Sequence, residues 1–442
     1  MRTISFQLFL AVLISIVVMS PLPCSGDSFL ESFRSKTPIL PKDELRAAWV
    51  VRYALTSREG IDRAVDYAVR ARFHLLFVQV RGRADAYYRS NLESSARDLE
   101  LPVDVFDPLD YFLKRAHEAG IAVHVWINVF YVWSDHENRP PDGHIVLDHP
   151  EWLATNRDGV RMDQLPVSVW TKRGLEGSFV SPGNPEARRH IVDVIADIAA
   201  RYPIDGVHLD YVRYPGIQFD YGVGERTAFA LRYGVDPLRF GTADSHEENP
   251  IAGEDVSSFG SDENTSGGGG DESFLGTGAA ALIDSLFTEW RVAQVDSLVR
   301  SVRDVIGGLP LSAAVIPESE TARIAKGQDW VGWIQRGLVD FVVPMAYTYT
   351  PAELVPLVRT IRRTIGADRF LVGLPVFDDR SRYLGYSVSL LRHEDVLGYA
   401  LFSYNELEKE SFSIEFLQRV FFPEGDAVPA AEDSTDSTSP PD

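Results

Sequence analysis

Residues 204–215 read Ile204-Asp205-Gly206-Val207-His208-Leu209-Asp210-Tyr211-Val212-Arg213-Tyr214-Pro215, and this segment gives the clearest indication of the architecture. The apolar residues Val207, Leu209 and Tyr211 alternate with His208 and Asp210, which is the period of a β-strand. In a parallel barrel the two polar side chains would point inward, with Asp210 near the C-terminal end of its strand. Active sites of (β/α)8 barrels lie at that end, so Asp210 is the first candidate for a catalytic residue.

The same kind of strand recurs along the chain, separated by amphipathic helical stretches. Eight strands are expected, at residues 47–53, 74–80, 122–128, 206–211, 311–316, 341–346, 370–375 and 396–402. Asp107-Pro108 and Asn184-Pro185 place proline in the first turn of two expected helices. This alternation predicts an α/β fold, a single-domain (β/α)8 TIM barrel with long loops after the third and fourth strands. A doubly wound open sheet is the alternative, but no Gly-rich phosphate loop follows the first strand.

The ends of the chain differ in composition from its middle. Residues 1–26 combine a basic start, an apolar run and a Pro-containing break, as in a secretory signal peptide. We therefore expect an N-terminal linker over 27–44 and the barrel over 45–423. The protein is expected to be exported, periplasmic or extracellular. Its single cysteine, Cys24, is the one candidate for a lipid anchor and hence for a membrane association, although Pro23 fits a lipoprotein signal poorly.

The net charge of −21 is concentrated in two segments. Residues 241–276 contain nine acidic residues and residues 424–442 contain six, and neither segment contains Lys or Arg. Both compositions are typical of disorder, so we expect a disordered acidic insertion within the barrel and a disordered acidic tail. No basic stripe is present, which argues against nucleic acid as a partner.

Polar and aromatic residues collect at the ends of the expected strands, which is the chemistry of a sugar site. Two carboxyl groups cleave a glycosidic bond, aromatic rings stack on sugar C–H groups, and Arg, Asn and Gln bind hydroxyls. The predicted catalytic pair is Asp210, as nucleophile or base, and Glu318, as proton donor, with Asp378 in reserve. The predicted substrate-binding residues are Arg52, Gln79, Arg81, Trp126, Asn128, His208, Tyr347 and Tyr404.

Some of these residues have a structural alternative. An inward His208 at mid-strand is more often a core histidine with satisfied hydrogen bonds than a ligand-binding one. A metal site is not expected, because the first strand reads Val51-Arg52-Tyr53 where metal-dependent barrel hydrolases carry His-x-His, and no His-Glu-x-x-His occurs. No cofactor is expected either.

Several segments resemble the bacterial family-10-like glycosyl hydrolases. They are Arg46–Arg52, Val78–Tyr88, His149–Leu153, Ser181–Arg188, Asp205–Pro215 and Gly373–Pro375. The resemblance implies an exported (β/α)8 protein that hydrolyses cell-envelope polysaccharide, with peptidoglycan glycan strands as one such substrate and Asp210 at a catalytic position. Two other functions stay open: a catalytically inactive glycan-binding barrel and a metal-dependent hydrolase.

Overall fold

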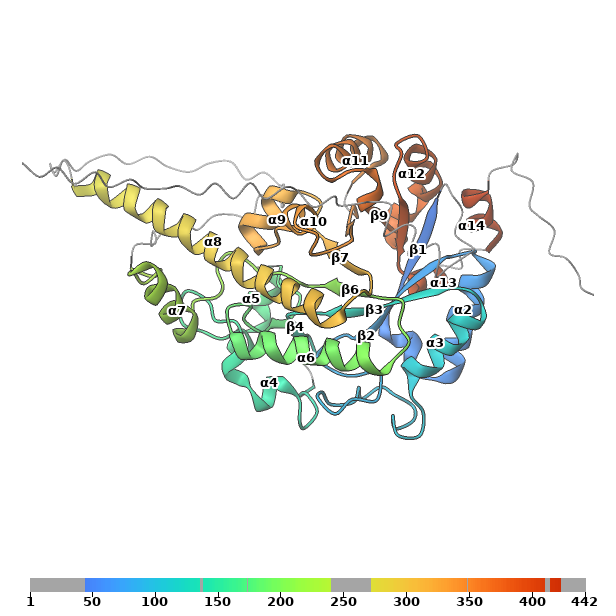
Figure 1. Cartoon of the computed structure of the whole chain (residues 1–442), viewed down its shortest axis with the longest axis horizontal. Helices are drawn as coiled ribbons and strands as arrows, with labels where there is room; N and C mark the ends of the chain where they lie inside the picture. Colours follow the sequence, from blue (N-terminus) through green and yellow to red (C-terminus); the bar gives the residue numbers. More distant parts are fainter. Residues whose placement is uncertain are drawn as a thin grey trace, which may run out of the picture.

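A computed structural model describes residues 44–135, 138–172, 174–239, 272–347, 349–409 and 414–422. Eight parallel strands form the central sheet, in the order β8-β7-β6-β3-β2-β1-β10-β9 (Figure 1). Single bridges between Val342 and Phe370 and between Met345 and Gly373 join β8 to β9 and close the ring. The strands are β1 Leu45–Val50, β2 Leu75–Arg81, β3 Ala122–Asn128, β6 Gly206–Asp210, β7 Leu311–Val315, β8 Phe341–Pro344, β9 Leu371–Pro375 and β10 Gly398–Phe402. The predicted (β/α)8 barrel is confirmed.

The first and last strands of the barrel are neighbours. Leu45 of β1 pairs with Gly398 of β10, and the register continues to Ala48 and Leu401. A Cβ on Gly398 would lie 2.0 Å from the carbonyl oxygen of Leu45, so this contact requires glycine. The pairing brings residues more than three hundred positions apart into one hydrogen-bonded ladder.

Helices surround the barrel, and each helical stretch expected from the sequence contains one. They are α2 Arg58–Arg70, α3 Pro108–Glu118, α4 Ile145–Asp148, α5 Val167–Lys172, α6 Pro185–Arg201, α7 Val223–Tyr233, α8 Glu272–Ile306, α9 Ser319–Lys326, α10 Trp330–Gln335, α11 Pro351–Ile365, α12 Leu384–Leu391, α13 Tyr404–Lys409 and α14 Ile414–Phe421. The side chains of Asp107 and Asn184 accept hydrogen bonds from the first turns of α3 and α6, with proline at the start of each helix.

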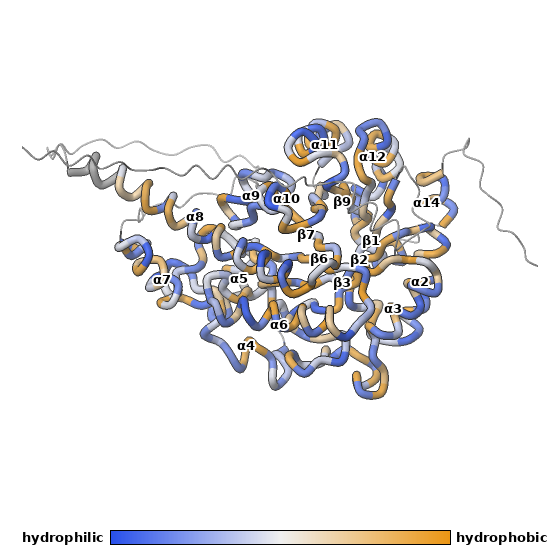
Figure 2. Tube along the Cα trace, in the orientation of Figure 1, coloured by the Kyte–Doolittle hydropathy of each residue, from blue (hydrophilic) through white to orange (hydrophobic). Residues whose placement is uncertain are grey.

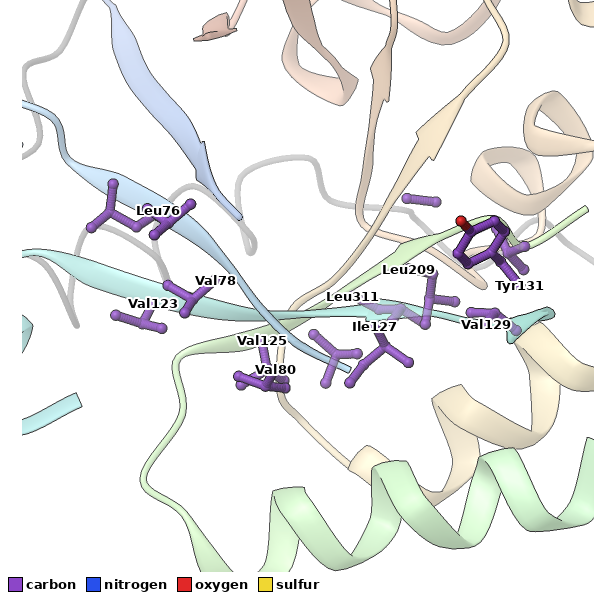
Figure 3. Packing of buried hydrophobic residues seen from close by; sticks show 14 of the residues in the cluster. Leu76, Val78, Val80, Val123, Val125, Ile127, Val129, Tyr131, Leu209 and Leu311 are labelled. Carbon is purple, nitrogen blue, oxygen red and sulfur yellow. The ribbon is translucent and has the colours of Figure 1, made fainter. Parts of the chain in front are cut away.

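Alternate residues of each strand face the helices or the barrel interior. Leu76, Val78 and Val80 of β2 lie beside Val123 and Val125 of β3 in the layer between strands and helices (Figure 3). Hydrophobic and hydrophilic residues alternate along the helices, as expected when one helix face packs on the barrel (Figure 2). Because both faces of every strand are covered, the strands are almost entirely buried, which is the pattern of a parallel sheet.

Two long connections extend the barrel. The chain between β3 and β6 holds the antiparallel pair β4 Tyr131–Trp133 and β5 Ser178–Phe179. The chain between β6 and β7 holds α7 and the long helix α8, which projects well beyond the barrel (Figure 1). The expected disordered insertion lies outside the described residues, except that its last residues begin α8. The expected signal peptide, linker and acidic tail lie outside them as well, apart from Glu44.

Candidate active site

Asp210 is the last residue of β6 and lies opposite Asn128, the last residue of β3. Its side chain is buried, with 6% of the residue exposed. The backbone N–H of Tyr211 donates a 2.6 Å hydrogen bond to Asp210 Oδ1. The alternation of residues 206–211 predicted this position, because an inward carboxylate at the end of a barrel strand reaches the active-site face.

The surroundings of Asp210 favour its protonated form. Burial raises the pKa of Asp210 from 3.8 to about 6. The guanidinium of Arg213, the Tyr211 N–H and the indole of Trp126 lower this pKa, whereas the nearby Glu176 raises it. The strongest cationic influence on Asp210 comes from Arg213, three residues further along the chain, rather than from the predicted substrate-binding residues Arg52 and Arg81.

A platform of aromatic and charged side chains lies beside Asp210. The ring of Tyr211 stands 4.7 Å from the ring of Tyr131 and 5.8 Å from that of Phe179. The guanidinium carbon of Arg213 lies 4.7 Å from the centre of the Tyr211 ring, and its Nη2 is 3.4 Å from Glu176 Oε2. Strand pair β4–β5 therefore brings Tyr131, Phe179 and Glu176 beside the residues that follow Asp210, a contribution that the strand-end pattern did not identify.

Glu176 is a site residue that sequence reasoning missed. It lies in the long connection after β3, outside every strand and motif, so its position depends on how β5 returns to pair with β4. The one available signal was the expectation that this connection overhangs the C-terminal ends of the strands.

Tyr347, which follows β8, faces Asp210 from the other side. Burial and the charge of Asp210 both raise the pKa of the Tyr347 phenol. Its hydroxyl is buried, and no described residue forms a hydrogen bond with it. The Tyr347 ring lies 5.4 Å from Phe402, 5.8 Å from Phe377 and 6.4 Å from Trp49. Aromatic rings therefore surround Tyr347, although the predicted Tyr404 is not among these three neighbours, and the unsatisfied Tyr347 hydroxyl is suited to a ligand.

Trp126 and Asn128 form the floor of the site next to Asp210. Trp126 Nε1 donates a 2.8 Å hydrogen bond to Asn128 Oδ1, and Asn128 Nδ2 donates to the carbonyl of Gly82 at 2.8 Å. Both residues are almost fully buried. Asn128 pairs with Asp210, and Trp126 lies one inward-facing position further into the barrel. Because both are buried, only a group that enters the barrel mouth could reach them.

Arg52 and Gln79 are joined at the rim. Gln79 Oε1 accepts from Arg52 Nη1 at 3.2 Å, and the guanidinium carbon of Arg52 lies 4.6 Å from the ring of Tyr53. Tyr53 is 58% exposed. Two of the predicted substrate-binding residues are therefore brought together beside an accessible aromatic ring.

Arg81 was predicted to bind substrate, but it does not face the barrel interior. The register slips between Gln79 and Arg81, so that Arg81 pairs with Ile127, a residue that packs toward the helices. Its Nη2 lies 2.7 Å from Glu93, and both side chains have no exposed surface. Burial favours the protonated form of Glu93, but Arg81 and His190 outweigh it and hold the pKa of Glu93 at about 2. Arg81 is thus a structural residue.

His208 and Tyr404 also have structural contacts in place of the predicted substrate contacts. His208 stacks on Phe77 at 4.0 Å, accepts from Trp49 Nε1 at 3.1 Å and bonds Ser312 Oγ at 2.9 Å. Burial lowers the pKa of His208 well below 6.5, in keeping with a neutral core histidine. Tyr404 begins α13 and packs on Tyr67 of α2 at 5.5 Å, on the helix side of the barrel.

The two other predicted carboxylates are exposed. Glu318 is the residue before α9, and its side chain does not cap that helix. Asp378 forms an ion pair with Arg380, which lowers the pKa of Asp378 to about 2. The carboxylate that affects Asp210 most is Glu176. Within the described ranges, no three His, Cys, Asp or Glu side chains gather as a metal site. No helix among these residues is long and apolar enough to cross a membrane.

The sequence is similar to those of known glycosyl hydrolases. The chain is 25% identical over 189 residues to glycosyl hydrolase YngK of Bacillus subtilis, covering 39% of this chain and 34% of that protein. It is 28% identical over 126 residues to glycosyl hydrolase DigH of Escherichia coli, covering 25% of this chain and 24% of that protein. The matches thus span about a third or less of these relatives.

Two solved structures share the fold at low sequence identity. The glycoside hydrolase domain of PgaB (BpsB) from Bordetella bronchiseptica superposes with a TM-score of 0.57 at 13% identity, covering 85% of this chain and 98% of that one. The catalytic domain of β-amylase from Paenibacillus polymyxa gives 0.51 at 11% identity, covering 83% and 94%. The family model described as glycosyl hydrolase-like 10 matches residues 44–355, which is more than half of the sequence. This chain therefore belongs to the glycosyl hydrolase-like 10 family.

Proposed function

We propose that this protein is an exported glycoside hydrolase that cleaves a cell-envelope or other extracytoplasmic polysaccharide, with peptidoglycan glycan strands as the first candidate substrate. One observation carries the proposal: a buried carboxyl group with a pKa of about 6, Asp210, at the C-terminal end of a barrel strand. Family membership supports the reaction class. A site with a proton-bearing carboxyl group, a cation and aromatic rings suits a sugar bond.

In this mechanism Asp210 is the proton donor. A carboxyl group whose pKa lies near the working pH can be protonated in the free enzyme and can give up its proton to the leaving oxygen. This reverses the roles expected from the sequence, which made Asp210 the nucleophile or base and Glu318 the donor. The reversal follows from the burial of Asp210 and the exposure of Glu318.

The remaining rim residues bind the sugar. Tyr347 offers its buried hydroxyl to a ligand hydroxyl or amide, and the exposed ring of Tyr53 can stack on sugar C–H groups. Arg52 provides hydrogen-bond donors at the rim.

The test is product release from purified peptidoglycan and from a panel of other bacterial and plant glycans. We expect the wild-type protein to release new reducing ends from at least one glycan and Asp210→Asn to release almost none. A protein that sediments with a glycan without cleaving any member of the panel would be a glycan-binding barrel. Loss of turnover in chelator, restored by a divalent metal, would favour the metal-dependent alternative.

A further inference from the structure

Glu176 is held over the C-terminal end of β6 by its neighbours in the chain. It comes two residues before β5, which pairs with β4 through Tyr131 and Phe179. Tyr131 Oη donates to the carbonyl oxygen of Glu176 at 3.4 Å. The next residue, Gly177, passes so close to β4 that a Cβ there would lie 2.5 Å from the carbonyl oxygen of Trp133. The position of Glu176 is therefore set by packing of its backbone.

The Glu176 carboxylate lies near enough to Asp210 for its charge to raise the pKa of Asp210. Its Oε2 lies 3.4 Å from Arg213 Nη2, and the Arg213 guanidinium covers the ring of Tyr211, the residue after Asp210. Glu176 also acts on Lys326 of α9. Burial and the charge of Arg213 lower the pKa of Lys326 to about 8, and the charge of Glu176 opposes this shift. The charged and titratable groups around Glu176 are Asp210, Tyr131, Tyr211, Arg213 and Lys326.

The two carboxyl groups differ sharply in their access to water. The side chain of Glu176 is 54% exposed, whereas Asp210 is 6% exposed. A carboxylate that water reaches is suited to accept a proton from water. A buried carboxyl group is suited to hold a proton until the bond breaks.

We propose that Glu176 is the second carboxylate of the reaction and acts as the general base for the attacking water. The proposal rests on the glycosidase function proposed above. Glu176 takes a proton from water as the water oxygen bonds to the anomeric carbon. The bond from that carbon to the glycosidic oxygen breaks, its electron pair stays on the oxygen, and Asp210 protonates that oxygen. The products are one new reducing end and one new hydroxyl, and exchange with solvent resets both carboxyl groups. Direct attack by water inverts the anomeric centre.

The experiment uses the full-length protein and purified peptidoglycan glycan strands. We compare the release of reducing ends over a range of pH by the wild type, by Glu176→Gln and by Glu320→Gln. Glu320 is an exposed carboxylate on α9, so its variant is the matched control. We expect Glu176→Gln to lower kcat/KM by about 10²–10⁴-fold, the usual contribution of a general base. Removing the negative charge of Glu176 lowers the pKa of Asp210, so the alkaline limb of the residual activity should move to lower pH. Glu320→Gln should match the wild type, and proton NMR of the first product should show inversion.

Each failure has its own signature. Suppose that the wild type cleaves these strands, that the turnover of Glu176→Gln stays within severalfold of wild type, and that its pH profile does not move. Glu176 is then not the base. Retention at the anomeric centre would also overturn the base assignment. If the wild type cleaves neither these strands nor any other glycan, the proposed function itself fails. Circular dichroism checks that each variant is folded. Glu176→Asp keeps the negative charge and should restore part of the activity, which a misfolded protein would not do.

Discussion

The backbone N–H of Tyr211 donates a 2.6 Å hydrogen bond to Oδ1 of Asp210, and Tyr211 adopts a left-handed conformation with φ of 49°. A tyrosine rarely takes this conformation, which costs about 1–3 kcal/mol. The strained turn aims one backbone N–H at Asp210 and leaves the Tyr211 ring on Tyr131. An ionised Asp210 would therefore keep one strong hydrogen bond after it has given up its proton.

The donor role of Asp210 predicts how the leaving group affects its variants. Asp210→Asn keeps the shape of the side chain and removes its proton, so turnover of a natural glycan should fall by several orders of magnitude. Activated aryl glycosides need little protonation and should lose much less activity. Steady-state kinetics on both substrate classes measure the difference. The opposite result would be a selective loss of turnover on the natural glycan in Glu318→Gln and no such loss in Asp210→Asn. In that case Glu318, and not Asp210, would be the proton donor.

The same substitution should change stability in a pH-dependent way. The pKa of Asp210 is raised from 3.8 to about 6 by folding, so its contribution to stability is complete below about pH 4 and is lost as pH rises through 6. Asp210→Asn, which never ionises, should therefore be more stable than the wild type at pH 7 by on the order of 2–3 kcal/mol. The two melting temperatures should converge near pH 3.5. Thermal unfolding at both pH values provides the measurement, and equal melting temperatures at pH 7 would show that Asp210 is not destabilised by its surroundings.

Arg213 should shift the pH profile in the opposite direction to Glu176. Its guanidinium lowers the pKa of Asp210, so Arg213→Gln should raise that pKa above about 6. If Asp210 acts in its protonated form, the alkaline limb of kcat/KM against pH should then move to higher pH. Arg213→Lys retains the charge and serves as the control. An unchanged limb in Arg213→Gln would mean that the limb reports some other group.

The hydroxyl of Tyr347 gives a test that separates binding from folding. It is buried without a hydrogen-bond partner among the described residues, so Tyr347→Phe should leave stability unchanged or raise it by about 1 kcal/mol. A bound sugar would supply the missing partner, so the same variant should lose about tenfold or more in kcat/KM. Calorimetry and glycan kinetics test the two halves. Full activity in Tyr347→Phe would show that this hydroxyl takes no part in binding.

The Arg81–Glu93 pair should be essential to the fold. Glu93→Ala leaves a fully buried guanidinium uncompensated and should cost about 3–5 kcal/mol. The exposed pair Arg63–Glu408 is a matched control, and Glu408→Ala should cost less than about 1 kcal/mol. Because folding lowers the pKa of Glu93 to about 2, the contribution of the pair is present above about pH 4.5 and is lost as pH falls through 2. Denaturant titrations at pH 7 compare the two variants, and equal losses would contradict the structural role of Arg81.

The sequence predicted the features that depend on local pattern. Strand alternation placed Asp210 at the end of β6, and the Asp-Pro and Asn-Pro pairs located the starts of α3 and α6. Strict alternation failed at Arg81, because a register slip within β2 turned its side chain toward the helices. A bulge of this kind leaves no reliable mark in a single sequence.

The remaining site features depend on contacts between distant segments. Glu176 reaches Asp210 only because β5 returns to pair with β4, and no local pattern encodes that return. Tyr404 follows the last strand, and sequence spacing does not show whether a residue there lies at the barrel mouth or among the helices. The packing of Tyr404 on Tyr67 places it among the helices. The effect of Glu176 on the pKa of Asp210 was missed for the same reason.

The pairing of β1 with β10 also limits the order in which this protein can be made. Leu45 leaves the ribosome long before Gly398, its hydrogen-bonded partner, has been synthesised. Until then the edge of β1 lacks its neighbour, and the ring of strands is open. A nascent chain that stops before residue 398 therefore carries an unpaired, apolar strand edge, so completion of the barrel must wait until β10 has been synthesised.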